Sequence, residues 1–209
     1  MIEINPSLPT ATGHAFSRAP QANIERSKFD RSCNWKGSME AGKLYPVYMD
    51  EMLPGDTFSM STSHVCRMQP MVKPIMDNLY FDMQYWFVPN RLVWENWDRM
   101  MGERRPLPTS SIDYVTPQII HLNAAGQIDP TGLYGCLGIP PITPTVSLSH
   151  NALPLRAYNL TWNEWYRDEN LQDMVDQHID DGPDATADLC FSKPHRIYKL
   201  LYYYQKRTC

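Results

Sequence analysis

The chain has 209 residues and a formal net charge of −4, with 43% hydrophobic and 20% charged residues. This composition is typical of a globular chain and argues against wholesale disorder. No stretch approaches the roughly 20 apolar residues of a membrane helix, and the N-terminus lacks the build of a secretory signal. A membrane protein and an ordinary exported protein are therefore disfavoured. The 18 prolines against 10 glycines favour strands joined by long ordered connections over long helices.

Residues 1–38 are predicted to form an extended N-terminal arm, because no helical or strand period lasts more than a few residues there. Large apolar side chains in a polar arm suggest anchoring on another surface, while basic residues interleaved with aromatic ones suit phosphates and bases. Both interpretations stay open. The candidate contacts to a neighbouring subunit are Phe16, Phe29 and Trp35, and the candidate DNA contacts are Arg18, Arg26, Lys28 and Arg31.

The next part of the chain alternates apolar and polar residues, which predicts β-strands. Residues 43–49 and 58–62 are expected to be strands, separated by a turn at Leu53-Pro54-Gly55-Asp56. The strongest predicted strand runs over residues 77–88, with one wholly apolar side and a second side that is at least partly covered. The apolar side consists of Leu79, Phe81, Met83, Tyr85 and Phe87.

Two amphipathic helices are predicted further along the chain, over residues 90–101 and about 154–168. Asn90 suits the N-cap of the first and Gly102 its end. Residues 106–150, with seven prolines, are expected to be a long loop. The aromatic faces of the helices are expected to pack in a core or to meet another subunit. The candidate residues for these contacts are Arg91, Trp94, Trp97, Trp162 and Trp165.

No pattern in the sequence indicates catalysis. The six histidines are isolated, and the five cysteines include no close pair of the kind that binds zinc. The acidic run 173–184 lacks the alternating ligands and final glutamate of a calcium loop, so a solvated loop is expected. The sequence therefore predicts a protein that is not an enzyme, with no catalytic, metal or cofactor-binding residues.

The charge changes abruptly near the C-terminus. Residues 161–188 hold nine acidic residues and one base, whereas residues 189–209 hold five bases and no acidic residue. One hypothesis for this atypical basic tail is a change of reading frame or a contig edge between Ala185 and Leu189. The flanking nucleotide sequence would decide.

Several long strings resemble the major capsid protein of gokushoviruses, small single-stranded DNA phages of the Microviridae. PIMDNLYFDMQYWFVPNRLVWENWDRMMGE (74–103) is the most characteristic of them. FSRAPQANIERSKFDRS (16–32), YMDEMLPGDTFSM (48–60), LPLRAYNLTWNEWYRDENLQD (153–173) and DDGPD (180–184) are similar to family strings in the same order. The resemblance covers about residues 14–184, and the tail after Asp188 departs from it.

The resemblance implies a mainly β fold, a viral jelly-roll β-sandwich with long loop and short helical insertions that is incomplete in this chain. Residues 39–188 would be the N-terminal part of that capsid domain. It also implies a structural subunit that assembles in the bacterial cytoplasm into a small icosahedral shell around circular single-stranded DNA. Expected partners are other copies, the packaged DNA and other virion proteins, with no membrane. The alternative is a standalone β-sandwich that binds carbohydrate or nucleic acid.

Overall fold

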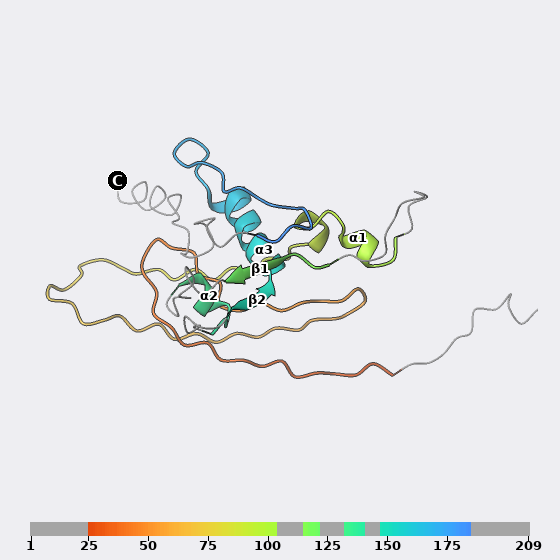
Figure 1. Cartoon of the computed structure of the whole chain (residues 1–209). Helices are drawn as coiled ribbons and strands as arrows, with labels where there is room; N and C mark the ends of the chain where they lie inside the picture. The colour runs from red at the N-terminus through yellow and green to blue at the C-terminus, as the bar shows by residue number, and fades with distance from the viewer. Residues whose placement is uncertain (1–24, 104–114, 122–131, 141–146, 185–209) are drawn as a thin grey trace, which may run out of the picture. The chain divides into compact units, whose positions relative to one another are not determined.

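A computed structural model of the chain describes residues 25–103, 115–121, 132–140 and 147–184 (Figure 1). The chain divides into two units, Met1–Asn34 and Trp35–Cys209. In the first unit, residues 25–34 are extended and exposed, without helix or strand. The predicted basic tail and the start of the predicted arm lie outside the described residues.

The second unit is organised around helix α3, Leu153–Thr161, which continues as a π-helical segment over Trp162–Tyr166. Pro154 stands in its first turn, where a missing backbone N–H costs no hydrogen bond. The side-chain oxygen of Asn151 accepts the N–H of Leu153 at 2.9 Å and so satisfies one free donor at the helix start. The predicted helix over 154–168 is confirmed.

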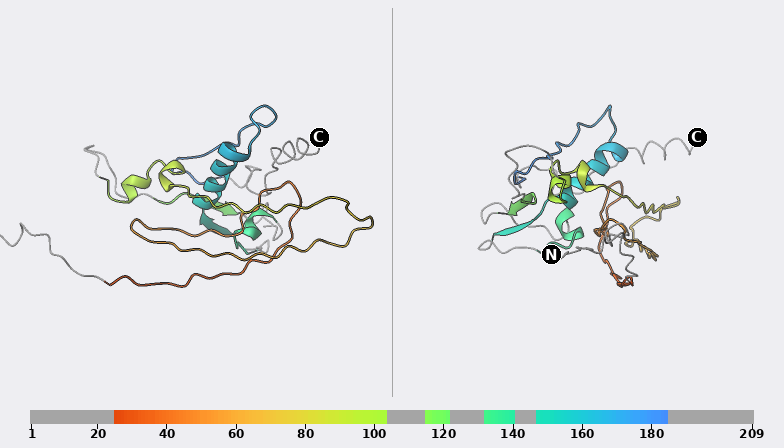
Figure 2. Two further views of the ribbon diagram at one scale, coloured as in Figure 1. Left: turned by 180° about the vertical axis from the view of Figure 1, so that it is seen from behind. Right: turned by 90° about the vertical axis from the view of Figure 1, so that its right-hand side faces the viewer.

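A small sheet lies beside α3 (Figure 2). Its strands occur in the part of the chain, residues 106–150, that was predicted to be a long loop. Strand β1, Gln118–His121, pairs antiparallel with β2, Leu148–Asn151, so that Ile119 faces His150 in the register. A short helix, α2 (Leu133–Cys136), lies between them in sequence. The loop prediction is wrong at these elements because segments of four residues are too short to show a hydrophobic period.

Among the described residues, the buried apolar side chains form three clusters, each of which includes residues of α3, of its π-helical extension or next to its start. The largest cluster joins the sheet and α2 to the helix and contains Ile119, Leu133, Tyr134, Ala152, Leu155 and Tyr158. A second joins the end of the helix to the following loop through Trp162, Tyr166 and Val175. A third packs Val93 and Trp94 on Leu153. The helix is therefore covered on several sides.

The predicted helix over residues 90–101 is broken into a 3₁₀ turn, Asn90–Leu92, and a short helix α1, Trp97–Met100. Asn90 lies inside the turn and makes no N-cap, whereas Gly102 does follow the last turn, with φ of 103°. The break has a physical cause, since backbone groups between the two pieces bond elsewhere. The carbonyl of Val93 accepts from Arg156, and the N–H of Glu95 donates to the carbonyl of Ile179.

Residues 57–88 form a long extended hairpin, which we call the ribbon, that doubles back at about residues 72–73 (Figures 1 and 2). The hydroxyls of Thr62 and Tyr85 are hydrogen-bonded, and the rings of His64 and Phe81 lie 5.0 Å apart. No strand is assigned within residues 44–103, so the predicted strands at 43–49, 58–62 and 77–88 are wrong in this structure. A two-stranded ribbon is marginal in water, because a strand needs neighbouring backbones to complete its ladders. The turn at 53–56 is confirmed by the 3.1 Å bond from the Asp56 N–H to the Leu53 carbonyl.

Candidate assembly interface

The predicted contact residues of the second unit that the structure describes lie in different surroundings. Trp94 and Trp162 are buried, and Trp97 is half-buried with its ring 6.1 Å from that of Trp94. Arg91 and Trp165 are exposed. The two buried tryptophans therefore act in packing within the chain, while Arg91 and Trp165 are accessible to another molecule.

The remaining predicted residues fall in or next to the arm. Phe16 and Arg18 lie outside the described residues, whereas Phe29, Arg26, Lys28 and Arg31 are exposed in the first unit. Trp35 begins the second unit and is half-buried. The roles predicted for these residues in contacting subunits or DNA stay predictions.

An acidic side chain is placed among the bases of the arm. Asp30 accepts hydrogen bonds from the hydroxyl and the backbone N–H of Ser32, the latter at 3.0 Å. These two bonds, the side-chain bond first, lower the pKa of Asp30 below its usual value. Its negative charge lies two residues from Lys28 and next to Arg31 in sequence, so it reduces the positive charge that this part of the arm offers to a phosphate.

The second unit contains a buried ion pair that the sequence did not predict. Arg156 of α3 donates to both carboxylate oxygens of Asp184, from Nε at 2.8 Å and from Nη2 at 2.7 Å. Its Nη1 also donates to the carbonyls of Val93 at 3.2 Å and Asp180 at 3.0 Å. Both side chains of the pair are almost completely buried. One guanidinium thus joins the helix, the segment around Val93 and the end of the acidic segment.

Further polar contacts hold the acidic segment, which we define as residues 168–184, against the packed body. By the packed body we mean α3, its π-helical extension and the residues that pack on them in the three buried clusters. The indole N–H of Trp94 and the side-chain amide of Asn96 both donate to the carboxylate of Asp181. The buried side chain of Asn163 exchanges two hydrogen bonds with the backbone of Val175, at 2.9 and 3.0 Å. The expected solvated loop is therefore wrong at these fixed points, although much of the segment between them is exposed.

One group in this region has the residue types of a metal site. Ligand atoms of His178, Asp180 and Asp184 lie within 4.8 Å of one another. Both oxygens of Asp184 already accept hydrogen bonds from the buried guanidinium of Arg156, so a cation would compete with that side chain. The geometry therefore favours the ion pair as the role of Asp184.

The cluster beside the small sheet contains two titratable rings. Burial and, to a smaller extent, the nearby charge of Asp184 together raise the pKa of Tyr134 to about 12. Burial lowers the pKa of His150, against a smaller opposing effect of its contact with the Asn151 carbonyl. The two rings lie 5.8 Å apart, edge to face. Both shifts favour the neutral forms, which suits a packing role.

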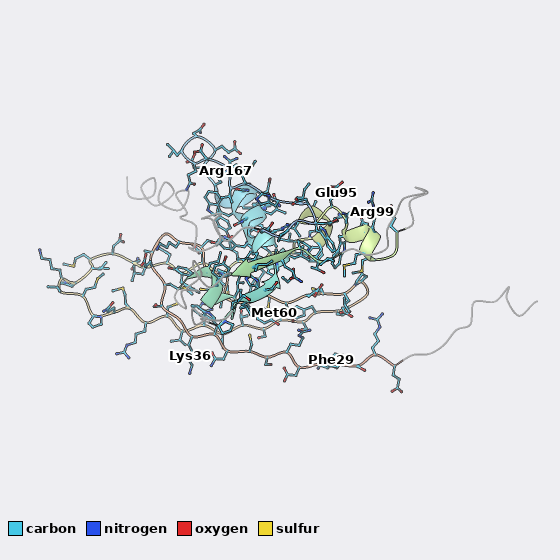
Figure 3. All side chains as sticks on the ribbon, in the orientation of Figure 1. Phe29, Lys36, Met60, Glu95, Arg99 and Arg167 are labelled. Atoms are coloured by element: carbon cyan, nitrogen blue, oxygen red, sulfur yellow. The ribbon has the colours of Figure 1, made fainter. Side chains whose placement is uncertain are left out.

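The ribbon has the opposite character, because its large apolar side chains face solvent. Val65 and Met76 are 97% exposed, and Phe87 is 77% exposed. Its last part is tied to α3's π-helical extension: the Trp86 ring lies 4.7 Å from that of Trp165, and its indole N–H donates to the Tyr166 hydroxyl at 3.2 Å. Figure 3 shows Met60 on this ribbon. A continuous apolar exposure of this kind marks a surface that another polypeptide covers.

Comparison with known proteins shows the family to which the chain belongs. The family model for the capsid protein (F protein) matches residues 17–207. This chain belongs to that phage capsid protein family. Membership places it among structural proteins rather than enzymes. The match includes most of the basic tail. In the described parts of the chain, no helix is long and apolar enough to cross a membrane.

Curated relatives in the capsid family include "Capsid protein VP1" of Chlamydia phage 1, 43% identical over 173 residues, which are 80% of this chain and 28% of the relative. "Capsid protein VP1" of Bdellovibrio phage phiMH2K is 41% identical over 188 residues, 88% of this chain and 34% of the relative. That of Spiroplasma virus 4 is 29% identical over 167 residues. The chain thus spans about a third of the length of these relatives.

The residues that fix the acidic segment are those that inspection of the sequence missed. Arg156 is a lone base in a helix that is followed by the acidic segment with its seven acidic residues, and this pattern was the available signal. A helical wheel places Arg156 about 100° from Leu155, outside the predicted apolar stripe, and does not show that α3 is covered on several sides. The exposed ribbon was missed for a different reason, since its sequence pattern predicts burial.

Proposed function

We propose that this chain is part of a self-assembling capsid subunit in the shell of a small single-stranded DNA phage. The observation that carries the proposal is the family match over residues 17–207, together with relatives named capsid protein VP1 at 41–43% identity. The exposed apolar ribbon supports it, because a shell subunit must bury such surface against other polypeptide.

The proposed fold of the complete subunit is a viral jelly-roll β-sandwich with long loop and short helical insertions, of which this chain forms a part. The match to the capsid protein family supports this fold, as does the antiparallel course of the ribbon. A jelly roll closes two sheets on each other, so the backbone partners that the ribbon lacks would come from other polypeptide.

The proposed partners are other copies of the subunit, the packaged circular DNA and other virion proteins, and the proposed location is the virion. Phe29, Trp35, Arg91 and Trp165 are candidates for contacts between copies, as is Phe16. Arg18, Arg26, Lys28 and Arg31 are candidates for the DNA phosphates, where each neutralised phosphate would add to the salt dependence of binding.

The test is assembly. Residues 1–184 replace the matching part of the Chlamydia phage 1 capsid protein VP1, and the chimera is expressed alongside the 209-residue chain. We expect the chimera to form regular particles in electron micrographs, with DNA protected from nuclease, and the shorter chain to form irregular assemblies. A chimera that stays a monodisperse monomer would contradict the proposal and favour a standalone binding module.

A further inference from the structure

The ribbon contains a segment that is both apolar and basic. Residues 64–76, which we call the ribbon tip, carry Arg67 and Lys73, and no acidic residue occurs between Asp56 and Asp77. All of its side chains are exposed. The large apolar members, exposed in the described structure, are Val65, Met68, Met71, Val72, Ile75 and Met76.

The acidic segment offers the complementary surface. Residues 168–184 contain seven acidic residues and neither lysine nor arginine. The carboxylates of Asp181 and Asp184 accept hydrogen bonds from other residues of the chain. Glu169, Asp173 and Asp176 are exposed. Three large apolar side chains are exposed among them, Leu171, Met174 and Ile179. Apolar side chains bordered by one sign of charge form the usual pattern of a protein interface.

We propose that the ribbon tip of one copy docks on the acidic segment of a second copy, an inference that rests on the proposed self-assembly. Arg67 and Lys73 would meet the exposed carboxylates at the border of the contact, and the tip's methionines would pack on Leu171 and Met174. Unbranched methionine side chains adapt to such uneven surfaces. The anchors at Arg156 and Asn163 hold the acidic segment in place, so little of it needs ordering on binding.

The two surfaces differ, so the contact is head-to-tail and every copy offers one of each. Contacts of this type repeat from copy to copy and close into rings when the rotation allows it. A nucleic acid partner is less suited to the tip, because its exposed surface is mainly aliphatic and carries only two fixed positive charges.

The test uses the 209-residue chain with a photo-crosslinking amino acid in place of Val72, prepared in a light and an isotopically heavy form and mixed. We expect light–heavy crosslinked peptides that join the tip to residues 168–184. Raising the salt from about 0.1 M to about 1 M shortens the Debye length from about 10 Å to about 3 Å, so the yield should fall severalfold. The matched control places the same amino acid at Leu53, which is 60% exposed outside the tip and should give no light–heavy crosslink to this segment.

Charge reversal provides a second, independent measurement. Arg67→Glu with Lys73→Glu should reduce the crosslink severalfold, and adding Asp173→Lys with Asp176→Lys should restore it. Lys36→Glu with Arg99→Glu makes the same change in net charge elsewhere and should have no effect (Figure 3).

The outcomes separate this inference from the proposed function. Crosslinks within single copies, crosslinks spread evenly over the chain, or crosslinks to nucleic acid alone would overturn the docking. Regular particles of the chimera without the tip-to-segment crosslink would overturn the docking and leave the capsid role standing. Failure of the chimera to form particles, with the crosslink retained, would contradict only the capsid role.

Discussion

Helix α3 and the ribbon are both rich in large apolar residues, yet one is buried and the other is exposed. Leu155 is 1% exposed, whereas Leu79 is 64% exposed. The helix makes its own backbone hydrogen bonds and needs only side-chain partners, which β1, α2 and the acidic segment supply. A strand needs backbone partners as well, and a lone hairpin does not provide enough of them. The difference shows that apolar pattern determines burial only where the backbone is also satisfied.

The largest expected effect is on the packed body, through its buried ion pair. Asp184→Asn leaves the buried Arg156 guanidinium without its charged partner, which typically costs about 3–5 kcal/mol in the free energy of unfolding. Pulse proteolysis in urea measures this on small amounts of dilute protein. The control is Asp173→Asn, an exposed acidic residue of the same segment, which should change the value by less than about 0.5 kcal/mol. Equal effects of the two substitutions would show that the ion pair does not hold the body together.

A matched pair of leucines tests the comparison directly. Leu155→Ala removes a fully buried side chain and leaves a cavity, so we expect a loss of about 2–5 kcal/mol in the free energy of unfolding. Leu79→Ala removes an exposed side chain of the ribbon and should cost less than about 0.5 kcal/mol. The same urea series measures both. A large cost at Leu79 would mean that the ribbon folds as part of the core.

The body could be predicted from sequence in some places and not in others, for physical reasons. The helix over 154–168 and the turn at 53–56 follow from local patterns, and both are present. Arg156 and Asp184 are 28 residues apart, and nothing local to either one indicates their pairing. Burial of Trp94 was expected, but its bond to Asp181 depends on the break in the predicted helix.

The ribbon shows the reverse limit. The alternation of apolar and polar residues over 77–88 predicts a strand, but this pattern describes only the side chains of one segment. Whether a strand forms depends on backbones that lie elsewhere in sequence or on another molecule. The family resemblance supplied the capsid role, whereas the candidate contacts in the arm and at Arg91 and Trp165 stay predictions.

A smaller effect is expected from pH. Burial lowers the pKa of His150 in the folded chain, so the unfolded chain binds the proton more readily. Stability is then highest above the ordinary histidine pKa of about 6.5 and falls as the pH drops through that value. Urea unfolding followed by tryptophan fluorescence between about pH 7.5 and 5 measures the slope. His150→Gln should flatten this pH dependence. An unchanged or steeper slope in that variant would contradict the assignment.

The smallest effect on stability, and the one that separates the two regions most sharply, is expected at Phe87. Its ring is 77% exposed, so Phe87→Ser should change the free energy of unfolding by less than about 0.5 kcal/mol. The same substitution removes a large apolar group from a surface that we assign to contacts with other polypeptide, so sedimentation velocity should show weaker self-association. If the free energy of unfolding is unchanged and self-association is weakened, this part of the ribbon is a surface that contacts another polypeptide. Loss of more than about 1 kcal/mol of stability would instead place Phe87 in a core within one copy, because exposed substitutions rarely reach that value.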